Sequence, residues 1–145
     1  MRAVIQKVSS ASVTVDGEVV GQIGYGLLVL LGIKKDETQK ERDKMIKKIL
    51  NLRIFPNEEN YFDKSVVDTN GEILLVSQFT LYGNCTKGNR PSFSDAMPPQ
   101  EAIEVYNDFA AELARQYSKV QGGIFGANMQ VALVNDGPVT IVLGD

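Results

Sequence analysis

The chain has 145 residues, of which 43% are hydrophobic and 23% charged, and its formal net charge is -3. This composition excludes a disordered chain, and the length predicts a single domain, residues 1–145, with a core that needs no disulfide or metal. The acidic balance argues against a protein that coats nucleic acid through many lysine and arginine contacts, although it permits binding to one end of an RNA.

Two residue types set further limits. Histidine is absent, which removes the commonest general base, every Ser-His or Cys-His pair and a preferred zinc ligand. The single cysteine, Cys85, excludes an internal disulfide and a cysteine-rich metal site, so we expect no metal and no cofactor. With one reduced cysteine, no signal-peptide core and no apolar run long enough to cross a bilayer, we expect a cytoplasmic protein with no membrane partner.

The first third of the chain predicts strands followed by a helix. Alternation favours a strand over residues 2–8 and a hairpin of 11–15 and 18–23 around Asp16-Gly17. A buried strand is predicted over residues 27–33. Thr38 and Glu41 have the spacing of a capping box at the start of a helix over 38–52. Its apolar stripe is Met45, Ile46, Ile49 and Leu50, and Lys40, Lys44, Lys47 and Lys48 lie off it. For these lysines a solvated face is the plainer interpretation and an RNA-binding patch the alternative.

The stretch from residue 74 to residue 83 is the centre of the predicted site. An apolar run over 73–76 predicts a buried strand, and Ser77, Gln78 and Thr80 bring polar groups to its end. A long segment with little pattern, 84–98, follows, and such loops are often functional. Within it, Lys87 and Arg90 are candidate phosphate contacts or solvated side chains, and an interface between subunits is a further alternative for Arg90.

The remaining elements complete a mixed fold. Weak strands are expected at 53–55 and 61–67, and turns at 57–60, 68–71 and 122–123. A second helix is predicted over 99–117, with an apolar stripe of Ile103, Tyr106, Ala110, Leu113 and Tyr117. Strands follow at 129–134 and 139–143. The order indicates an α/β fold whose mixed sheet is partly barrel-like, with two main helices packed on the outside.

The segment 135–140 joins the last two predicted strands. Pro138 cannot donate to a strand ladder, so an ordinary Asp-Gly hairpin is not expected there. Only about 5–6% of X–Pro bonds in folded proteins are cis, so the residues by themselves predict a rigid trans turn.

Two motifs together carry a resemblance to a known family. Ser77-Gln78-Phe79-Thr80-Leu81 and Asn135-Asp136-Gly137-Pro138-Val139-Thr140, at this separation and in a chain of this length, are similar to those of the D-aminoacyl-tRNA deacylases. Residues 4–8, 26–32, 90–93 and 129–131 agree, so the resemblance runs from end to end.

The resemblance implies a homodimer with a D-aminoacyl-tRNA deacylase-like fold. It also implies hydrolysis of the ester between a D-amino acid and the 3′ end of tRNA, removal of glycine from some tRNAs, and rejection of L-aminoacyl-tRNA. Ser77, Gln78, Phe79 and Thr80 then line the pocket floor, and Phe125 and Met129 its sides. The Gly137-Pro138 bond is expected to be cis, with its carbonyls reaching into the partner's pocket to hold the substrate's amino group.

The expected chemistry needs little from side chains. A backbone N–H near Phe79 is placed to stabilise the oxyanion, and the family implies that the terminal ribose 2′-hydroxyl assists. We favour a role for Thr80 in orienting a water molecule or capping the end of the strand. The alternative is that it acts as a nucleophile, without a histidine to activate it. Cys85 as a nucleophile lacks a histidine too. Two other functions stay open: a non-catalytic module that binds nucleic acid or protein, and a dimeric structural protein whose Gly-Pro loop only locks the interface.

Overall fold

The computed structural model describes all residues from 1 to 145. In chain order, its elements are β1 (Arg2–Val15), β2 (Glu18–Ile23), β3 (Gly26–Gly32), α1 (Gln39–Asn51), β4 (Glu72–Ser77), the 3₁₀ helix η1 (Phe79–Tyr82), α2 (Pro99–Gln116), β5 (Val120–Gly122) and β6 (Gln130–Gly144). No helix combines the length and the apolar character that a membrane span requires.

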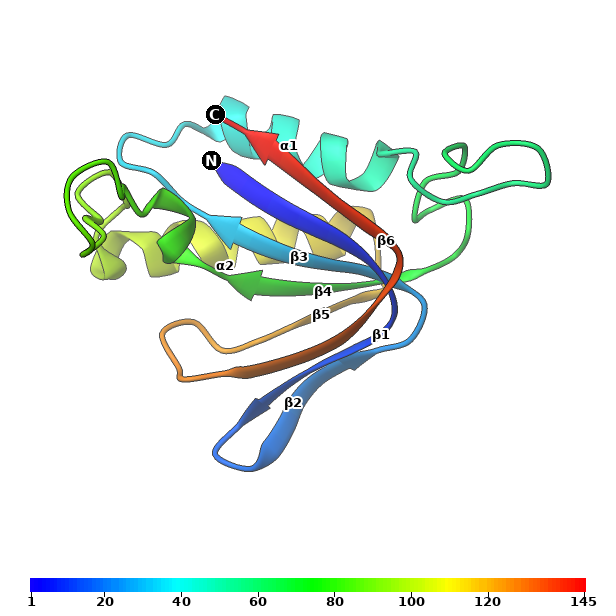
Figure 1. Ribbon diagram of the computed structural model, residues 1–145, viewed down its shortest axis with the longest axis horizontal. Coiled ribbons are helices and arrows are strands. Elements are labelled where there is room, and N and C mark those ends of the chain that lie inside the picture. Colours follow the sequence, from blue (N-terminus) through cyan, green and yellow to red (C-terminus); the bar gives the residue numbers. More distant parts are fainter.

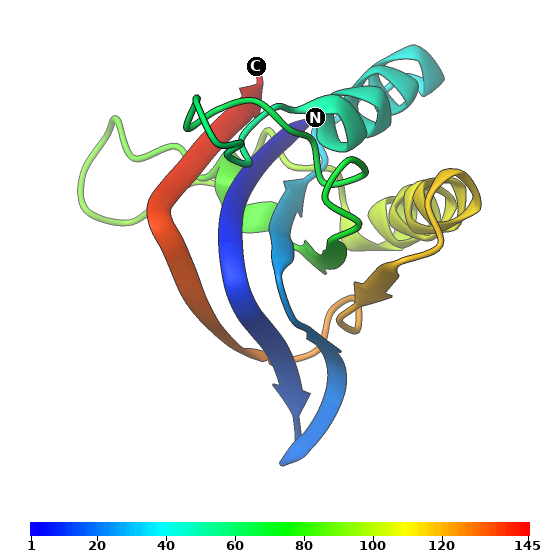
Figure 2. The same ribbon diagram turned by 90° about the vertical axis from the view of Figure 1, so that its right-hand side faces the viewer.

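The six strands form one mixed sheet. Its order is β2-β1-β3-β4-β5. β2 and β3 pair with one edge of β1, and β6 pairs with the other edge. β1 is antiparallel to β2, β3 and β6, whereas β3, β4 and β5 run parallel. The sheet curves strongly and encloses part of its own inner surface (Figures 1 and 2). The predicted mixed, partly barrel-like α/β fold with two helices is therefore confirmed.

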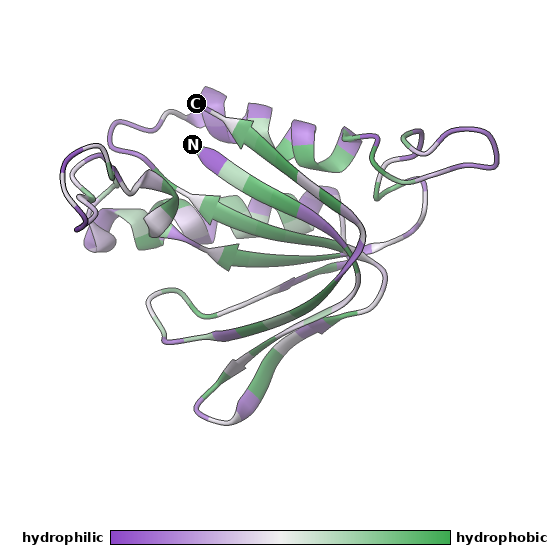
Figure 3. Ribbon diagram, in the orientation of Figure 1, coloured by the Kyte–Doolittle hydropathy of each residue, from purple (hydrophilic) through white to green (hydrophobic).

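Both helices cover the same face of this sheet (Figure 2). The strands and the helices bury a shared apolar cluster, to which β3 contributes Leu27, Val29 and Leu31. Hydrophilic residues face outward on α1 and hydrophobic ones face the sheet (Figure 3). A second apolar cluster lies on the other face of the sheet, where the curled strands cover it. Because both faces are buried, β3 and β4 are apolar along nearly their whole length.

The caps and turns of the first half follow the sequence signals. Asp16 and Gly17 both have positive φ, 49° and 80°, as the two-residue hairpin turn requires. Thr38 caps α1, and its reciprocal hydrogen bonds with Glu41 complete the predicted capping box. The four predicted apolar residues of α1 are the buried ones.

Several predicted strands are wrong. Segments 53–55 and 61–67 contain only the isolated bridge between Phe55 and Lys64. Ser65 and Asp68 instead hydrogen-bond each other's backbone in a turn, so this segment does not join the sheet. Residues 2–8 and 11–15 form one continuous strand rather than two, and β5, which pairs with β4, was not predicted.

The predicted buried face of α2 is also partly wrong. Its buried residues are Ala102, Tyr106, Phe109 and Leu113. Ile103 is 39% exposed, because the face that meets the sheet is rotated from the one that the largest aliphatic side chains suggested.

Residues 130–144 form one bent strand instead of two strands joined by a turn. Both halves of β6 pair with β1, from Thr14 opposite Gln130 to Arg2 opposite Gly144. Between these halves the register shifts, so the segment 136–139 stands opposite Lys7 as a bulge.

The side chain of Asn135 closes this bulge. Its Oδ1 accepts from the backbone N–H of Val139 at 2.8 Å, and its Nδ2 donates to the Val139 carbonyl at 3.1 Å and to Thr140 Oγ1 at 3.1 Å. The Gly137-Pro138 bond is cis. The trans bond expected from the residues alone is therefore wrong, and the cis bond that the resemblance implied is confirmed.

Candidate functional site

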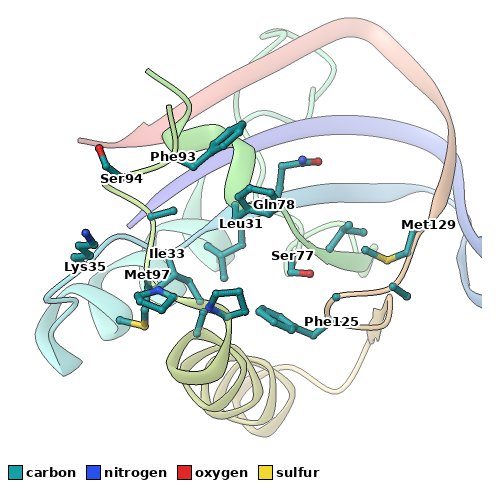
Figure 4. A pocket seen from close by; sticks show the side chains of 18 of the residues that line it. Leu31, Ile33, Lys35, Ser77, Gln78, Phe93, Ser94, Met97, Phe125 and Met129 are labelled. Carbon is teal, nitrogen blue, oxygen red and sulfur yellow. The ribbon is translucent and has the colours of Figure 1, made fainter. Parts of the chain in front are cut away.

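A cavity of about 770 Å³ opens at the end of the sheet where β3 and β4 finish. Its walls come from four parts of the chain: the ends of these two strands, the segment 93–98, the first turn of α2, and the loop between β5 and β6 together with the start of β6 (Figure 4). Twelve of its 19 lining residues are hydrophobic. Such a cleft, mostly apolar with a few polar groups, is the usual form of a small-molecule site.

The end of β4 supplies the polar floor of the cavity. The N–H of Gln78 donates to the Leu31 carbonyl at 2.8 Å, which extends the pairing with β3 by one residue beyond β4. The chain then turns into η1, and the Gln78 side-chain amide donates to Thr80 Oγ1. The N–H groups of Phe79 and Thr80, in the first turn of η1, donate no hydrogen bond within the chain. Two backbone donors are therefore available beside the floor.

Phe79 and Phe93 together form an aromatic edge. The Phe79 ring is 57% exposed and contacts the Phe93 ring edge to face, with 5.0 Å between centroids. Gly32, at the end of β3, lets η1 pack closely against this strand, because a Cβ at Gly32 would lie 3.1 Å from both the Gln78 carbonyl oxygen and Leu81 Cβ.

The opposite wall contains Phe125 and Met129. The ring of Phe125 lies against the buried ring of Tyr106, with 5.6 Å between centroids. Tyr106 Oη donates to the Leu75 carbonyl at 3.1 Å, and burial raises the pKa of this phenol to about 12. Gly123 leaves room for Met129, whose Sδ would lie 2.6 Å from a Cβ at that position.

The cavity brings together five of the predicted site residues, Ser77, Gln78, Phe79, Phe125 and Met129. Thr80 does not line it, although it bonds to Gln78 at its border. Gly137 and Pro138 are exposed, lie in the bend of β6, and are not among the lining residues either. Figure 1 shows this bend beyond the starts of β3 and β4, at the opposite end of the sheet from the cavity. Within one chain, the two motifs are therefore apart.

The three candidate residues of the long loop lie outside the cavity. Cys85 is a free, exposed thiol, and Lys87 and Arg90 are also exposed. None of the three lines the cavity. No group of three or more His, Cys, Asp or Glu side chains is arranged to hold a metal ion.

Sequence reasoning missed several lining residues: Leu31, Ile33, Lys35, Val76, Ser94, Ala96, Met97, Pro98, Pro99 and Ala102. The segment after β3 pairs with the end of the long loop, through Lys35 N–H to the Asp95 carbonyl at 3.0 Å and Met97 N–H to the Ile33 carbonyl at 3.0 Å. The unusual length of the loop was the available signal, but its pairing partner depends on the tertiary fold. Lys35 is the only charged lining residue.

Known proteins resemble this chain over its whole length. The sequence profile of the D-Tyr-tRNA(Tyr) deacylase family matches residues 4–144. The chain belongs to this family. A D-aminoacyl-tRNA deacylase from Roseiflexus castenholzii is 57% identical over 143 residues, which cover 99% of this chain and 91% of that protein. One from Thermosipho africanus is 52% identical, with 99% and 96% covered.

Solved structures give the same assignment of the fold. A protein described as the c-Myc DNA Unwinding Element Binding Protein superposes with a TM-score of 0.94 at 51% identity, covering 100% of this chain and 99% of that one. A probable eukaryotic D-amino acid tRNA deacylase superposes with a TM-score of 0.83 at 18% identity, covering 98% and 97%, and so supports the fold alone. The predicted membership of the deacylase family is thus confirmed, and with it the prediction of a hydrolase family.

Proposed function

We propose that this protein hydrolyses the ester bond of D-aminoacyl-tRNA, releasing the D-amino acid and free tRNA while sparing L-aminoacyl-tRNA. The observation that carries the proposal is the end of β4, where the deacylase motif places two unpaired backbone N–H groups beside an apolar cavity. The identity of more than half of the residues with a named deacylase supports the same reaction. Because aminoacyl-tRNA is made and used in the cytoplasm, we place the protein there.

The reaction requires stabilisation of charge more than a strong base. When water attacks the ester carbonyl, negative charge develops on its oxygen, and the N–H of Phe79 or Thr80 is available to stabilise it. No histidine exists in the chain, and the only ionisable lining group is Lys35. We therefore assign proton transfer to the 2′-hydroxyl of the terminal ribose, which lies next to the ester in the substrate itself. It would accept a proton from the attacking water and donate its own to the departing 3′ oxygen.

Thr80 fits an orienting role in this scheme. Its hydroxyl accepts the hydrogen bond from the Gln78 amide and has no base beside it, so it lacks the activation that a nucleophilic hydroxyl needs. The bond instead stabilises the turn that presents the N–H groups of η1.

We propose that the second motif acts in the cavity of a partner subunit in a homodimer. Gly137 and Pro138 are exposed and distant from the cavity of their own chain, as expected of groups that serve another copy. They lie on β6, whose outer edge is unpaired and which exposes Val134 and Val142 (57% and 67%). Natural proteins rarely leave so long an edge strand uncovered, which supports an interface there.

The backbone of the partner's Gly-Pro segment would then select the chirality of the amino acid on the substrate. The carbonyl groups of the Gly137-Pro138 segment would hold the α-amino group and occupy the space that an L side chain needs. Gly137, which has a φ of 150°, has no Cβ to obstruct a close approach. Glycine carries no side chain to exclude, so glycyl-tRNA would also be hydrolysed.

The proposed activity is tested with D-Tyr-tRNA and L-Tyr-tRNA under identical conditions. We expect the D ester to be hydrolysed and the L ester to survive. Equal rates on the two esters, or no hydrolysis of either, would refute the proposal.

The cross-subunit arrangement has its own test. A Gly137→Ala variant should lose activity or discrimination while remaining dimeric, because its Cβ would lie 2.7 Å from Val139 Cγ2 and 2.8 Å from Val139 N. A heterodimer of this variant with a Phe79→Pro variant, which lacks the N–H, should regain one working site, since one cavity and one Gly-Pro segment stay intact. Heterodimers as inactive as both parents would contradict the arrangement.

One observation favours a second candidate function, that of a non-catalytic nucleic-acid-binding module. The 51% identical structure carries the name of a DNA-element-binding protein. This candidate predicts tight binding of nucleic acid without ester cleavage, so the D-Tyr-tRNA assay separates the two.

A further inference from the structure

We propose that the outer face of α1, together with Lys35, binds the phosphate backbone of the tRNA acceptor end as it leaves the cavity. The lysine track consists of Lys35, Lys40, Lys44, Lys47 and Lys48, all of them exposed. The inference rests on the proposed function, because it specifies how the same site holds the rest of its substrate.

The cavity itself indicates where a polymeric substrate leaves. Lys35 lies at one end and Met129 at the other, with Ser77 between them nearer Met129 (Figure 4). A tRNA whose ester is held at Ser77 and Phe79 has to continue out of the cavity. The end at Lys35 offers the only charge among the lining residues, and it is positive.

From Lys35 the chain reaches α1 after only three residues, so the basic end of the cavity adjoins the start of this helix. The four lysines of α1 stand at positions i, i+4, i+7 and i+8, which fall on one face. That face is opposite the buried stripe, so it points away from the sheet (Figure 3). Between Lys40 and Lys48 it extends for about 12 Å along the helix axis.

These lysines are free to bind anions. None of the five makes an ion pair, whereas Lys34, next to Lys35, pairs with Glu41 and Asp145 at 3.2 and 3.0 Å. The acidic residues of α1 are themselves engaged. Glu41 bonds to Thr38 in addition to Lys34, and Asp43 accepts from the Gln39 amide at 2.8 Å. The helix therefore presents positive charge that its own carboxylates do not neutralise.

Local stability accounts for only part of this arrangement. Lys48 in the last turn complements the helix dipole, and Asp43 has favourable spacing to Lys47. Lys40 in the first turn opposes the dipole, however, and its like charge at Lys44, four residues on, destabilises the helix. A polyanion bound along the face would remove both of these costs. A chain with a net charge of -3 that concentrates four unpaired lysines on one helix face has the charge distribution of a local phosphate site.

The other helix is less suited to guide the RNA. α2 also begins at the cavity, but its exposed face carries Glu101, Glu104 and Asp108, none of them in an ion pair, whereas Glu112, one turn later, pairs with Arg115 at 2.6 Å. Phosphates that followed α2 would meet repulsion. The two helices, of opposite surface charge, thus direct the RNA along α1.

The test is direct binding of uncharged tRNA, measured by fluorescence anisotropy over a series of salt concentrations. We expect the double variant Lys40→Gln/Lys44→Gln to bind about tenfold more weakly at low salt, roughly threefold for each lysine. The slope of log affinity against log salt should become shallower by about 1.4–1.8, the contribution of two phosphate contacts. Lys35→Gln alone should weaken binding about threefold.

The matched control is Lys64→Gln/Lys119→Gln, which removes the same two charges from exposed positions outside the track. It should bind within about twofold of the wild type and keep its salt slope. Glutamine is as good a helix former as lysine, so the α1 variant should fold, which circular dichroism verifies. Equal loss in both double variants, or none in the α1 variant, would overturn the inference. Because no ester is cleaved in this assay, its result is independent of whether the proposed hydrolysis is found.

Discussion

Replacing Tyr106 by Phe removes one buried hydroxyl from the wall behind the cavity and leaves its ring in place. The hydroxyl donates to the Leu75 carbonyl at 3.1 Å, and that carbonyl also accepts from the Gly123 N–H at 3.1 Å. The acceptor therefore keeps a partner in the variant. The ring still packs against Phe125, so no cavity forms and the wall keeps its shape.

Near neutral pH the cost should be small. The loss of one buried hydrogen bond whose acceptor stays satisfied lowers the free energy of unfolding by about 0.5–1 kcal/mol. Because the wall is unchanged, the rate of D-aminoacyl-tRNA hydrolysis should stay within about twofold of the wild type.

At alkaline pH the order of stability should reverse. Burial raises the pKa of Tyr106 to about 12 in the folded protein, against about 10 in the unfolded chain. The unfolded chain thus loses this proton first, and the wild type loses stability as pH rises from about 10 to about 12. By about pH 11 this loss reaches ~1.4 kcal/mol. The Phe variant has no such proton, so it should equal or exceed the wild type there.

The measurement is urea unfolding followed by far-ultraviolet circular dichroism, at several pH values from about 8 to about 11. Both proteins are compared at one concentration, because the stability of the proposed dimer would depend on concentration. The control is Tyr61→Phe, which removes the hydroxyl of a tyrosine that is 51% exposed. It should match the wild type at the neutral end of the series. A constant difference between wild type and Tyr106→Phe at every pH would refute the reasoning.

Three further variants test the framework of the site. Gly32→Ala should displace η1 by a few tenths of an ångström, since its Cβ would lie 3.1 Å from the Gln78 carbonyl oxygen, and should lower kcat/KM about tenfold; unchanged kinetics would show that η1 tolerates the shift. Asn135→Ala should lower the free energy of unfolding by about 2 kcal/mol, because three hydrogen bonds across the β6 bulge are lost, and wild-type denaturation would contradict this. Thr80→Val should retain activity within about tenfold if the hydroxyl only orients the turn, whereas complete inactivation in single-turnover assays would point to a covalent role.

Local signals in the sequence determined the elements whose physics is local. The capping box of Thr38 and Glu41, the Asp16-Gly17 turn and the buried stripe of α1 depend on residues within a few positions of one another, and each was predicted. The apolar run that ends at Ser77 likewise identified the central strand and the polar floor of the site.

Only the tertiary structure decided which distant segments meet. Residues 61–67 had a weak strand pattern, but their turn satisfies its backbone groups locally, while the short β5 became a strand because β4 lay beside it. β6 bends because both of its halves pair with β1 while residues 136–139 stand opposite Lys7 alone, and no local pattern encodes a shared partner. Similarly, Lys35 lines the cavity because the end of the long loop pairs with the segment after β3. Pairing between remote segments depends on the whole packed sheet, whereas caps, turns and amphipathic stripes depend on neighbours along the chain.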